Sequence, residues 1–392
     1  MIKIALIRGP YLRPNGVLPW IYLNDNFDDI NITFYESKPA RFDTRHLKNV
    51  KQLLWLDGLF CIFGQKYILS KVLRRLRLPA NYLVGIKSVV QRSDIVHVSE
   101  NYHLFSFQAV RFAKRYKKKI CVTAGENIPF PPSQNNPITH YIKRYINRNV
   151  DRFTTTAPPG KQALIDEGVP SNKITIVPNT VDTDLFYPAE KNAAACNLPS
   201  SFNNTFNILF SHKLVYAKGV PYLLRAFKVF SEFVPCARLI LTGINKLDKN
   251  SNNLLNVLKS KGIVYHIEHT EYNRMPLLYN LCDVFILPSI KTKNNQEQFG
   301  MSILEAMACE KATIVTNVGG MPWVVEKGKT SIVIKERNIG DIVYAFMFLY
   351  KNEEKRREMG KAGRARVLSK FTPSVAAKQL QEIYQELIYE KG

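Results

Sequence analysis

The sequence predicts an α/β protein built from two doubly wound domains, and two observations lead to this fold class. The chain has 392 residues, which exceeds the size at which one hydrophobic core keeps growing, so two domains of roughly 190 residues are expected. Short apolar strands also alternate with amphipathic helices in two series, separated by a stretch that has neither period. Such alternation is typical of parallel sheets covered by helices on both faces.

The first series predicts an N-terminal Rossmann-like domain over residues 1–190. It opens with the strand KIALI, which runs directly into a loop, RGPYLRPNG. Further strands are expected at DIVHV (94–98), KICVTA (119–124), RFTTTA (152–157) and KITIVPN (173–179). The stretch that follows, TVDTDLFYPAEKNAAACNLPSSFNNTFN, is rich in Pro, Asn and Ser and predicts a linker.

The second series predicts a C-terminal Rossmann-like domain over residues 191–372. The strand NILFSHKL (207–214) precedes the helix GVPYLLRAFKVFSEF, in which Pro221 suits a first turn and apolar residues recur at helical spacing. Strands are then expected at ARLILTG, VYHIEH, DVFILPS and ATIVTNVGG. The segment 373–392 predicts a final helix with Leu380, Tyr384 and Leu387 on one face, which must pack on a domain, the N-terminal one being a candidate.

The charge of the chain is high and uneven. Fifty-five basic and 32 acidic residues give a net charge of +23, and residues 51–150 alone hold 17 Lys or Arg against four acids. This concentration favours an anionic partner, either nucleic acid or acidic lipid headgroups. Residues 51–119 combine aromatic and leucine-rich runs with Arg74, Arg75, Arg77 and the run RFAKRYKKK, which suits an anionic membrane surface. A core helix with a basic exposed face is the alternative.

The cellular location follows from what the sequence lacks. No apolar run reaches the roughly 18 residues of a membrane-spanning helix, and the N-terminus has no cleavable apolar core. Six cysteines are scattered without a CxxC pair, which argues against a zinc ribbon and a disulfide scaffold. We expect a cytoplasmic protein that can bind peripherally to the inner face of the cytoplasmic membrane. No metal site is predicted: the DxD match at Asp182 and Asp184 falls in the linker, where short acidic motifs occur by chance.

The stretch EQFGMSILEAMAC predicts a ligand site. Its helix begins near Gly300, and the free N–H groups of Gly300, Met301 and Ser302 would suit a diphosphate. Glu305 lies one turn into this apolar helix, where a charge needs hydrogen-bond donors, and its side chain leans back toward the helix N-terminus. Ribose hydroxyls would be matching donors, while pairing with a lysine is the alternative. Glu297 precedes the helix and points into the same crevice.

This pattern resembles the E-x7-E motif of family-4 glycosyltransferases. Further segments resemble that family in the same order along the chain: KITIVPNTVDTDLFYP, NILFSHKLVYAKGVPYLLRAF, LYNLCDVFILPS and VTNVGGMPWVV. The resemblance implies the GT-B fold, in which two Rossmann-like domains face each other across a cleft. The N-terminal domain would bind the acceptor and the C-terminal domain the nucleotide sugar.

The resemblance also assigns roles to single residues. Lys213 and Lys218 would hold the diphosphate of the donor, Glu305 the ribose and Glu297 the sugar hydroxyls. Gly300 and Met301 would offer amides to the phosphates. Two lysines after a strand are also the groups that stabilise a departing nucleoside diphosphate, so no metal is required. Gly16, in the loop after the first strand, matches the glycine-bearing loop of the family.

Two positions depart from the family pattern. Lys213 stands where arginine is usual and lacks the bidentate fork of a guanidinium. Gly125 in ICVTAGENIPF occupies the position of a histidine beside the reaction centre, and Glu126 is a candidate replacement.

The sequence therefore predicts a retaining, metal-independent hexosyltransferase that moves a sugar from a nucleotide-diphosphate sugar to a lipid-linked or other glycan acceptor at the membrane surface. The nucleotide sugar is a co-substrate, so no separate cofactor is expected. One rival is another GT-B enzyme, a nucleotide-sugar epimerase or a phosphorylase. The other is a basic nucleic-acid-binding protein, which is disfavoured because no binding module is recognisable.

Overall fold

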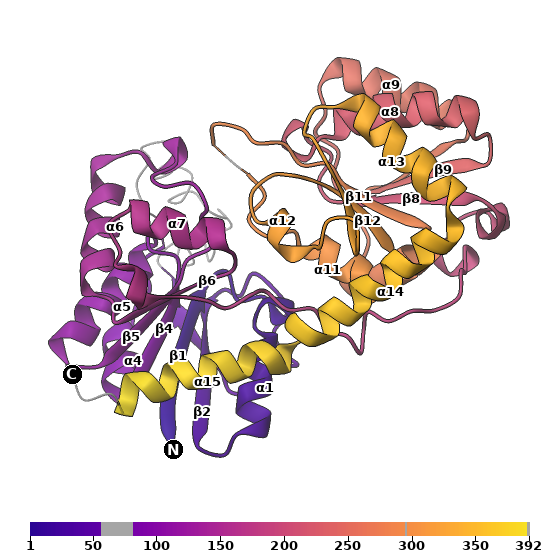
Figure 1. Ribbon diagram of the computed structural model, residues 1–392. Coiled ribbons are helices and arrows are strands. Elements are labelled where there is room, and N and C mark those ends of the chain that lie inside the picture. Colours follow the sequence, from indigo (N-terminus) through magenta and orange to yellow (C-terminus); the bar gives the residue numbers. More distant parts are fainter. Residues whose placement is uncertain (56–80, 295, 390–392) are drawn as a thin grey trace. The chain divides into compact units, whose positions relative to one another are not determined.

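The computed structural model describes residues 1–55, 81–294 and 296–389 of the chain and divides them into two compact units (Figure 1). Unit 1 comprises residues up to Thr180 together with the C-terminal segment that begins at Pro373. Unit 2 comprises Val181–Thr372. The chain passes between the units twice, and within unit 2 the two passing segments meet where the Val181 N–H donates to the Phe371 carbonyl (3.0 Å).

The described part of unit 1 contains a parallel sheet of seven strands in the order β3-β2-β1-β4-β5-β6-β7. Register pairs such as Ile4 with Ile32 on β2 and Leu6 with His97 on β4 place β1 between these two strands. The strands are β1 (Ile2–Gly9), β2 (Ile30–Lys38), β3 (Val50–Leu54), β4 (Ile95–Ser99), β5 (Lys119–Thr123), β6 (Arg152–Thr155) and β7 (Ile174–Ile176).

Two apolar clusters cover the two faces of this sheet. One face packs against α1 (Leu18–Asn26) and α15 (Pro373–Tyr389), which bury Leu23, Leu380 and Tyr384. The other packs against helices that include α4 (Ile86–Arg92), α5 (Leu104–Arg115), α6 (Pro137–Asn149) and α7 (Pro158–Asp166). The C-terminal helix therefore belongs to the core of unit 1.

Unit 2 contains a second parallel sheet, in which the described strands follow the order β10-β9-β8-β11-β12-β13. Runs of buried apolar residues, such as ILF in β8 and VFIL in β11, form strands that are covered on both sides. The strands are β8 (Phe206–Ser211), β9 (Ala237–Thr242), β10 (Val264–Ile267), β11 (Val284–Leu287), β12 (Ala312–Thr316) and β13 (Ser331–Ile334).

Helices cover both faces of this second sheet (Figure 1). One layer consists of α8 (Val220–Phe233), α9 (Lys249–Ser260) and α13 (Ile339–Lys351). The other includes α10 (Met275–Leu281), α11 (Met301–Ala308), α12 (Met321–Val324) and α14 (Glu353–Lys370). Helix starts follow local chemistry: the Asp248 and Asn338 side chains accept the N–H groups of Ser251 and Asp341.

The two all-parallel, helix-covered sheets confirm the predicted α/β class with two doubly wound domains. In unit 2 the strand order reverses between β8 and β11, and ligands of such sheets bind at the carboxyl ends of the strands at this switch point. Among the described residues, no helix combines the length and apolar character needed to cross a bilayer.

Candidate functional site

The candidate site lies at the carboxyl ends of β8 and β11, where the strand order of unit 2 reverses. Lys213 and Lys218 follow β8, while Glu297, Gly300 and Glu305 follow β11. Because parallel strands end at the same edge of a sheet, residues more than 70 positions apart come together here.

Lys218 and Glu297 form a partly buried ion pair. The Lys218 Nζ lies 2.5 Å from the Glu297 Oε2, and each side chain is only 12% exposed. The Ser289 hydroxyl donates to the same carboxylate oxygen (3.1 Å). The Glu297 carbonyl accepts the Gly320 N–H (3.0 Å), which ties this loop to the NVGG turn after β12. Two of the predicted residues are thus in direct contact.

Gly219 lets the lysine-bearing loop pack directly on the end of β11. Its φ is +72°, and a Cβ added there would lie 1.9 Å from the Pro288 carbonyl oxygen. Two residues away on each segment, the Ile290 N–H donates to the Ala217 carbonyl (3.0 Å), which also joins the two loops. Any side chain at position 219 would push the Lys218 loop away from the Glu297 loop.

The N-terminus of α11 faces this site without a side-chain cap. Gly300 is the N-cap residue, adopts the left-handed conformation (φ +91°) and forms no side-chain hydrogen bond to the first turn. A Cβ at Gly300 would lie 2.5 Å from the Ile303 Cδ1. The N–H groups of Met301 and Ser302 therefore lie in the first turn, at the positive end of the helix dipole. This arrangement is the usual geometry of an anion site.

Glu305 is buried in the second turn of α11 and is only 7% exposed. The Tyr279 hydroxyl donates to its Oε2 at 2.6 Å. Burial raises the pKa of Glu305 to about 7, while the hydrogen bond from Tyr279 acts in the opposite direction. One donor that this carboxylate needs is thus a tyrosine hydroxyl from α10. The sequence analysis did not predict this partner.

His212 is a second residue of this region that the sequence analysis did not identify. Its ring Nδ1 accepts the N–H of Lys213 (2.8 Å). Burial, followed by the charge of Lys218, lowers the pKa of His212 to about 4. The ring is therefore neutral at physiological pH. Because its Nδ1 is an acceptor, its Nε2–H is the group that it can donate to a ligand. Its position directly after β8 is the signal that could have identified it. Lys213 itself is exposed.

Gly16, the glycine predicted to serve the site from the loop after β1, lies in unit 1. This exposed residue ends the short 3₁₀ turn Pro14–Gly16, and an added Cβ would meet only the Arg13 Cβ at 3.7 Å. The backbone does not require glycine at this position. Three arginines predicted for membrane contact, Arg74, Arg75 and Arg77, lie outside the described residues.

A cluster of acidic and basic groups occupies the carboxyl ends of β4 and β5. Gly125, the residue at the family's histidine position, donates its N–H to the Glu100 carboxylate (3.2 Å). Burial and the charge of Glu126 raise the pKa of Glu100 to about 7. Beside them, Lys143 and Glu167 form a buried ion pair with an N–O distance of 2.5 Å. Glu100, two residues after the predicted strand at 94–98, is the acidic residue that the sequence analysis did not single out.

Asp182 of the DxD match takes part in the local backbone structure. The Asp182 carboxylate accepts the N–H groups of Asp184 and Leu185, so it caps a turn. The His266 Nε2–H donates to the Gly243 carbonyl (2.7 Å). His97 lies in the core of unit 1, where its ring nitrogens contact the hydroxyls of Tyr384 and Thr123.

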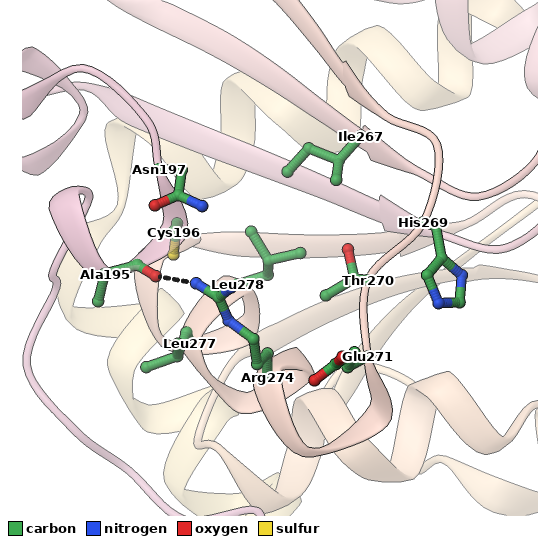
Figure 2. A pocket seen from close by; sticks show the side chains of 10 residues that line it. All are labelled: Ala195, Cys196, Asn197, Ile267, His269, Thr270, Glu271, Arg274, Leu277 and Leu278. Carbon is green, nitrogen blue, oxygen red and sulfur yellow. Dashed lines mark hydrogen bonds between the residues drawn. The ribbon is translucent and has the colours of Figure 1, made fainter.

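A pocket of about 280 Å³ lies beside the end of β10 in unit 2 (Figure 2). Glu271 and Arg274 belong to the turn that precedes α10, and Arg274 donates to the Ala195 carbonyl at 2.9 Å. Leu277 and Leu278 of α10 form an apolar wall. None of the predicted site residues lines this pocket.

Two protein-family models match the chain, one within unit 2 and one mostly within unit 1. Residues 199–366 match the family described as glycosyl transferases group 1, and residues 61–185 match glycosyltransferase family 4. Among curated proteins, alpha-maltose-1-phosphate synthase of Mycolicibacterium smegmatis is 26% identical over 231 aligned positions, and the match covers 55% of this chain and 57% of that protein. The match to mannosylfructose-phosphate synthase of Agrobacterium fabrum is 27% identical and covers 60% of this chain and 53% of that protein. The chain thus spans little more than half the length of these relatives.

Solved structures support the same fold. Alr3699/HepE of Anabaena in complex with UDP superposes with a TM-score of 0.76 at 15% identity, covering 98% of this chain and all of the other. Sucrose-phosphate synthase of Thermosynechococcus elongatus gives a TM-score of 0.74 at 17% identity, and both chains are fully covered. These neighbours confirm the predicted GT-B class. By its family matches and its fold, the chain belongs to the family-4 glycosyltransferases of the GT-B fold.

Proposed function

We propose that the protein transfers a hexosyl group from a nucleotide-diphosphate sugar to a glycan or glycolipid acceptor, with retention of anomeric configuration. The observation that carries this proposal is the convergence, at one switch point, of the Lys218–Glu297 pair with the uncapped N-terminus of α11. Lysine charge and helix amides together suit a diphosphate, and Glu297 and Glu305 suit hydroxyl groups.

The proposed mechanism assigns the departure of the nucleoside diphosphate to positive groups of unit 2. Negative charge develops on the leaving diphosphate, where Lys218, Lys213 and the N–H groups of Met301 and Ser302 would stabilise it. Glu297 would accept hydroxyls of the transferred sugar while it keeps Lys218 in place. Because lysines supply the charge, we expect transfer without a divalent metal, and activity should survive EDTA.

The donor nucleotide is best sought first among uridine nucleotides. The similar Anabaena protein was crystallised with UDP and with UDP-glucose. UDP-glucose is therefore the first donor to test, followed by other UDP-, GDP- and ADP-sugars.

The acceptor is proposed to be presented at a membrane surface. The basic segment 51–150 supports this, as does an exposed stripe on α6 that combines apolar and basic residues. Ile138 is exposed, and Tyr141 is 61% exposed, while Arg144 and Arg148 follow on the same face. Exposed aromatic and aliphatic residues beside arginines are typical of proteins that bind anionic lipid headgroups.

The test of the proposed transfer uses Glu297→Gln. The amide keeps the size of the side chain but removes the charge that fixes Lys218 and the sugar hydroxyls. We expect release of nucleoside diphosphate in the presence of a membrane extract to fall by about 100-fold or more, with nucleotide affinity within a few-fold of wild type. Full activity of the variant would contradict the assigned role. Donor turnover that needs no acceptor would contradict glycosyl transfer.

A further inference from the structure

Two arginines of unit 1 converge on one aromatic ring. Arg13 belongs to the loop that follows β1, while Arg41 and Phe42 belong to the segment that follows β2. The guanidinium carbon of Arg13 lies 4.8 Å from the centroid of the Phe42 ring, and that of Arg41 lies 6.0 Å from it. Because β1 and β2 are neighbouring parallel strands, both arginines lie at the carboxyl edge of the sheet, where ligands of doubly wound domains bind.

The carboxylates of this region have other partners. Asp43 forms a two-point ion pair with Arg45, with N–O distances of 3.0 and 2.7 Å. The buried Glu36 accepts hydrogen bonds from two neutral side chains, each at 2.9 Å. Among the residues that the structure describes, no carboxylate forms an ion pair with Arg13 or Arg41. The chain therefore supplies two neighbouring cations here without a counter-ion.

The electrostatics of this pair favour an external anion. Partial burial, followed by the charge of Arg41, lowers the pKa of Arg13. A cation that loses water beside a like charge is destabilised, and an anion bound between the two relieves both effects. Arginine presents its N–H donors as a planar fork that matches two oxygens of a phosphate. Two guanidinium groups together suit a group with two negative charges.

The same aromatic ring borders a cavity of about 670 Å³. Phe42 forms part of its wall, and Thr44, Asn49 and Gln52 give the wall polar groups. Polar side chains around an aromatic ring suit the hydroxyls and the apolar face of a sugar. The cavity thus offers space beside the arginines for a sugar that carries the anion.

We propose that Arg13 and Arg41 bind a phosphate or diphosphate group of the glycan acceptor, so that unit 1 selects phosphorylated acceptors. This inference rests on the proposed function, since it takes unit 1 to bind the acceptor. Acidic lipid headgroups present the same chemistry, but the membrane contact proposed above uses the exposed face of α6. The acceptor is therefore the source that the experiments address first.

The first experiment measures the affinity of the full-length protein for inorganic pyrophosphate by calorimetry, with excess UDP present to fill the proposed donor site. Arg13→Gln and Arg41→Gln should each weaken binding by about 10-fold or more. Arg45→Gln is the matched control, because it removes an equal charge from the same segment, but one that Asp43 already neutralises. Its affinity should remain close to that of wild type. Equal losses in all three variants, or a wild type that does not bind pyrophosphate, would overturn the site.

The second experiment separates the acceptor from lipid headgroups as the source of the phosphate. In the transfer assay, Arg13→Gln and Arg41→Gln should need about 10-fold more membrane extract for half-maximal release of nucleoside diphosphate, with the maximal rate and the donor KM unchanged. Sedimentation with phosphatidylglycerol vesicles should be the same for these variants as for Arg45→Gln.

The outcomes of this second experiment are distinct. Loss of vesicle sedimentation in Arg13→Gln and Arg41→Gln alone, with an unchanged dependence on extract, would assign the arginines to lipid and overturn the proposal. A wild type that binds pyrophosphate through both arginines but releases no nucleoside diphosphate would overturn the proposed function and leave the anion site standing.

Discussion

At the scale of the single residue, Glu305 combines a proposed binding role with a cost to the fold. The carboxylate is buried and accepts a hydrogen bond from Tyr279, yet its pKa is raised to about 7 from an ordinary value of 4.5. The unfavourable effect of burial is therefore larger than the favourable effect of its partners. Carboxylates whose pKa is raised by burial are enriched at functional sites, which supports the proposed role of Glu305.

Replacement of Glu305 by Gln should stabilise the fold at alkaline pH. A folded-state pKa above the unfolded value means that the folded protein holds the proton more tightly, so stability decreases as the pH rises from 4.5 through 7. Gln carries no charge and avoids this loss. We expect the variant to gain on the order of 2 kcal/mol at pH 8 and little at pH 4, as measured by chemical denaturation. Equal destabilisation at both values of pH would contradict the sign.

Sequence reasoning predicted the elements that carry the candidate residues but not the partners of those residues. The motif spacing placed Glu297 and Glu305 on a loop and a helix that the structure also shows. The alternatives considered for Glu305 were a lysine or a ligand, whereas its protein partner is a tyrosine 26 positions earlier. No local period relates two residues on different helices, so this contact depends on how α10 packs against α11.

At the scale of elements, the site depends on how closely the loops after β8 and β11 approach each other. Gly219 makes this approach possible because its Cα lies against the Pro288 carbonyl. The sequence identified the helix GVPYLLRAFKVFSEF and its first-turn proline, and both are present in α8. It did not reveal that Gly219 contacts another strand end, because that distance is set only when the sheet has formed.

Gly219→Ala should be much more damaging than Gly328→Ala. Both glycines have a left-handed backbone, with φ of +72° and +78°, but a Cβ at Gly328 would meet nothing within 4 Å. The conformational penalty of about 1–2 kcal/mol is common to both, and the clash with Pro288 adds to it only at Gly219. We expect Gly219→Ala to cost at least about 2 kcal/mol more in chemical denaturation and to abolish nucleotide binding. Equal losses would show that the loop can move aside.

Strand prediction identified ten of the thirteen described strands and missed three. The predicted runs correspond to β1 and to β4 through β12. The sequence analysis did not identify β2 (INITFYESK), β3 (VKQLL) or β13 (SIVI). β3 and β13 are edge strands with partly exposed residues, and β2 alternates apolar and polar residues, so none forms a continuous hydrophobic run.

At the scale of the whole molecule, the charge and the C-terminal helix are the main features. The helix α15 packs in unit 1, where the Tyr384 hydroxyl accepts from the Trp20 indole (2.7 Å) and contacts His97 (2.6 Å). The periodicity of Leu380, Tyr384 and Leu387 indicated which face would be buried, and all three are buried. Sequence alone could offer only a candidate domain for this contact, because amphipathicity specifies a face and not its partner.

Binding to anionic vesicles should depend on both salt and Tyr141. We expect the protein to sediment with vesicles containing acidic lipids at low salt and less at high salt, since charge attraction is screened. Tyr141→Ser should weaken binding several-fold. Tyr344→Ser on α13, which removes a tyrosine that is 69% exposed in unit 2, should have no effect. Absence of vesicle binding even at low salt would contradict the membrane proposal.

The most direct test of the central claim, that unit 2 binds a nucleoside diphosphate at the ends of β8 and β11, is thermal unfolding with UDP, GDP and ADP in excess. A ligand at about 100 times its dissociation constant stabilises the folded state by roughly 2.7 kcal/mol. We predict that one nucleotide raises the unfolding temperature and that Glu305→Ala loses this response while remaining folded. A wild-type protein that responds to none of the three, or a Glu305→Ala variant that responds equally, would contradict the assignment of the donor site.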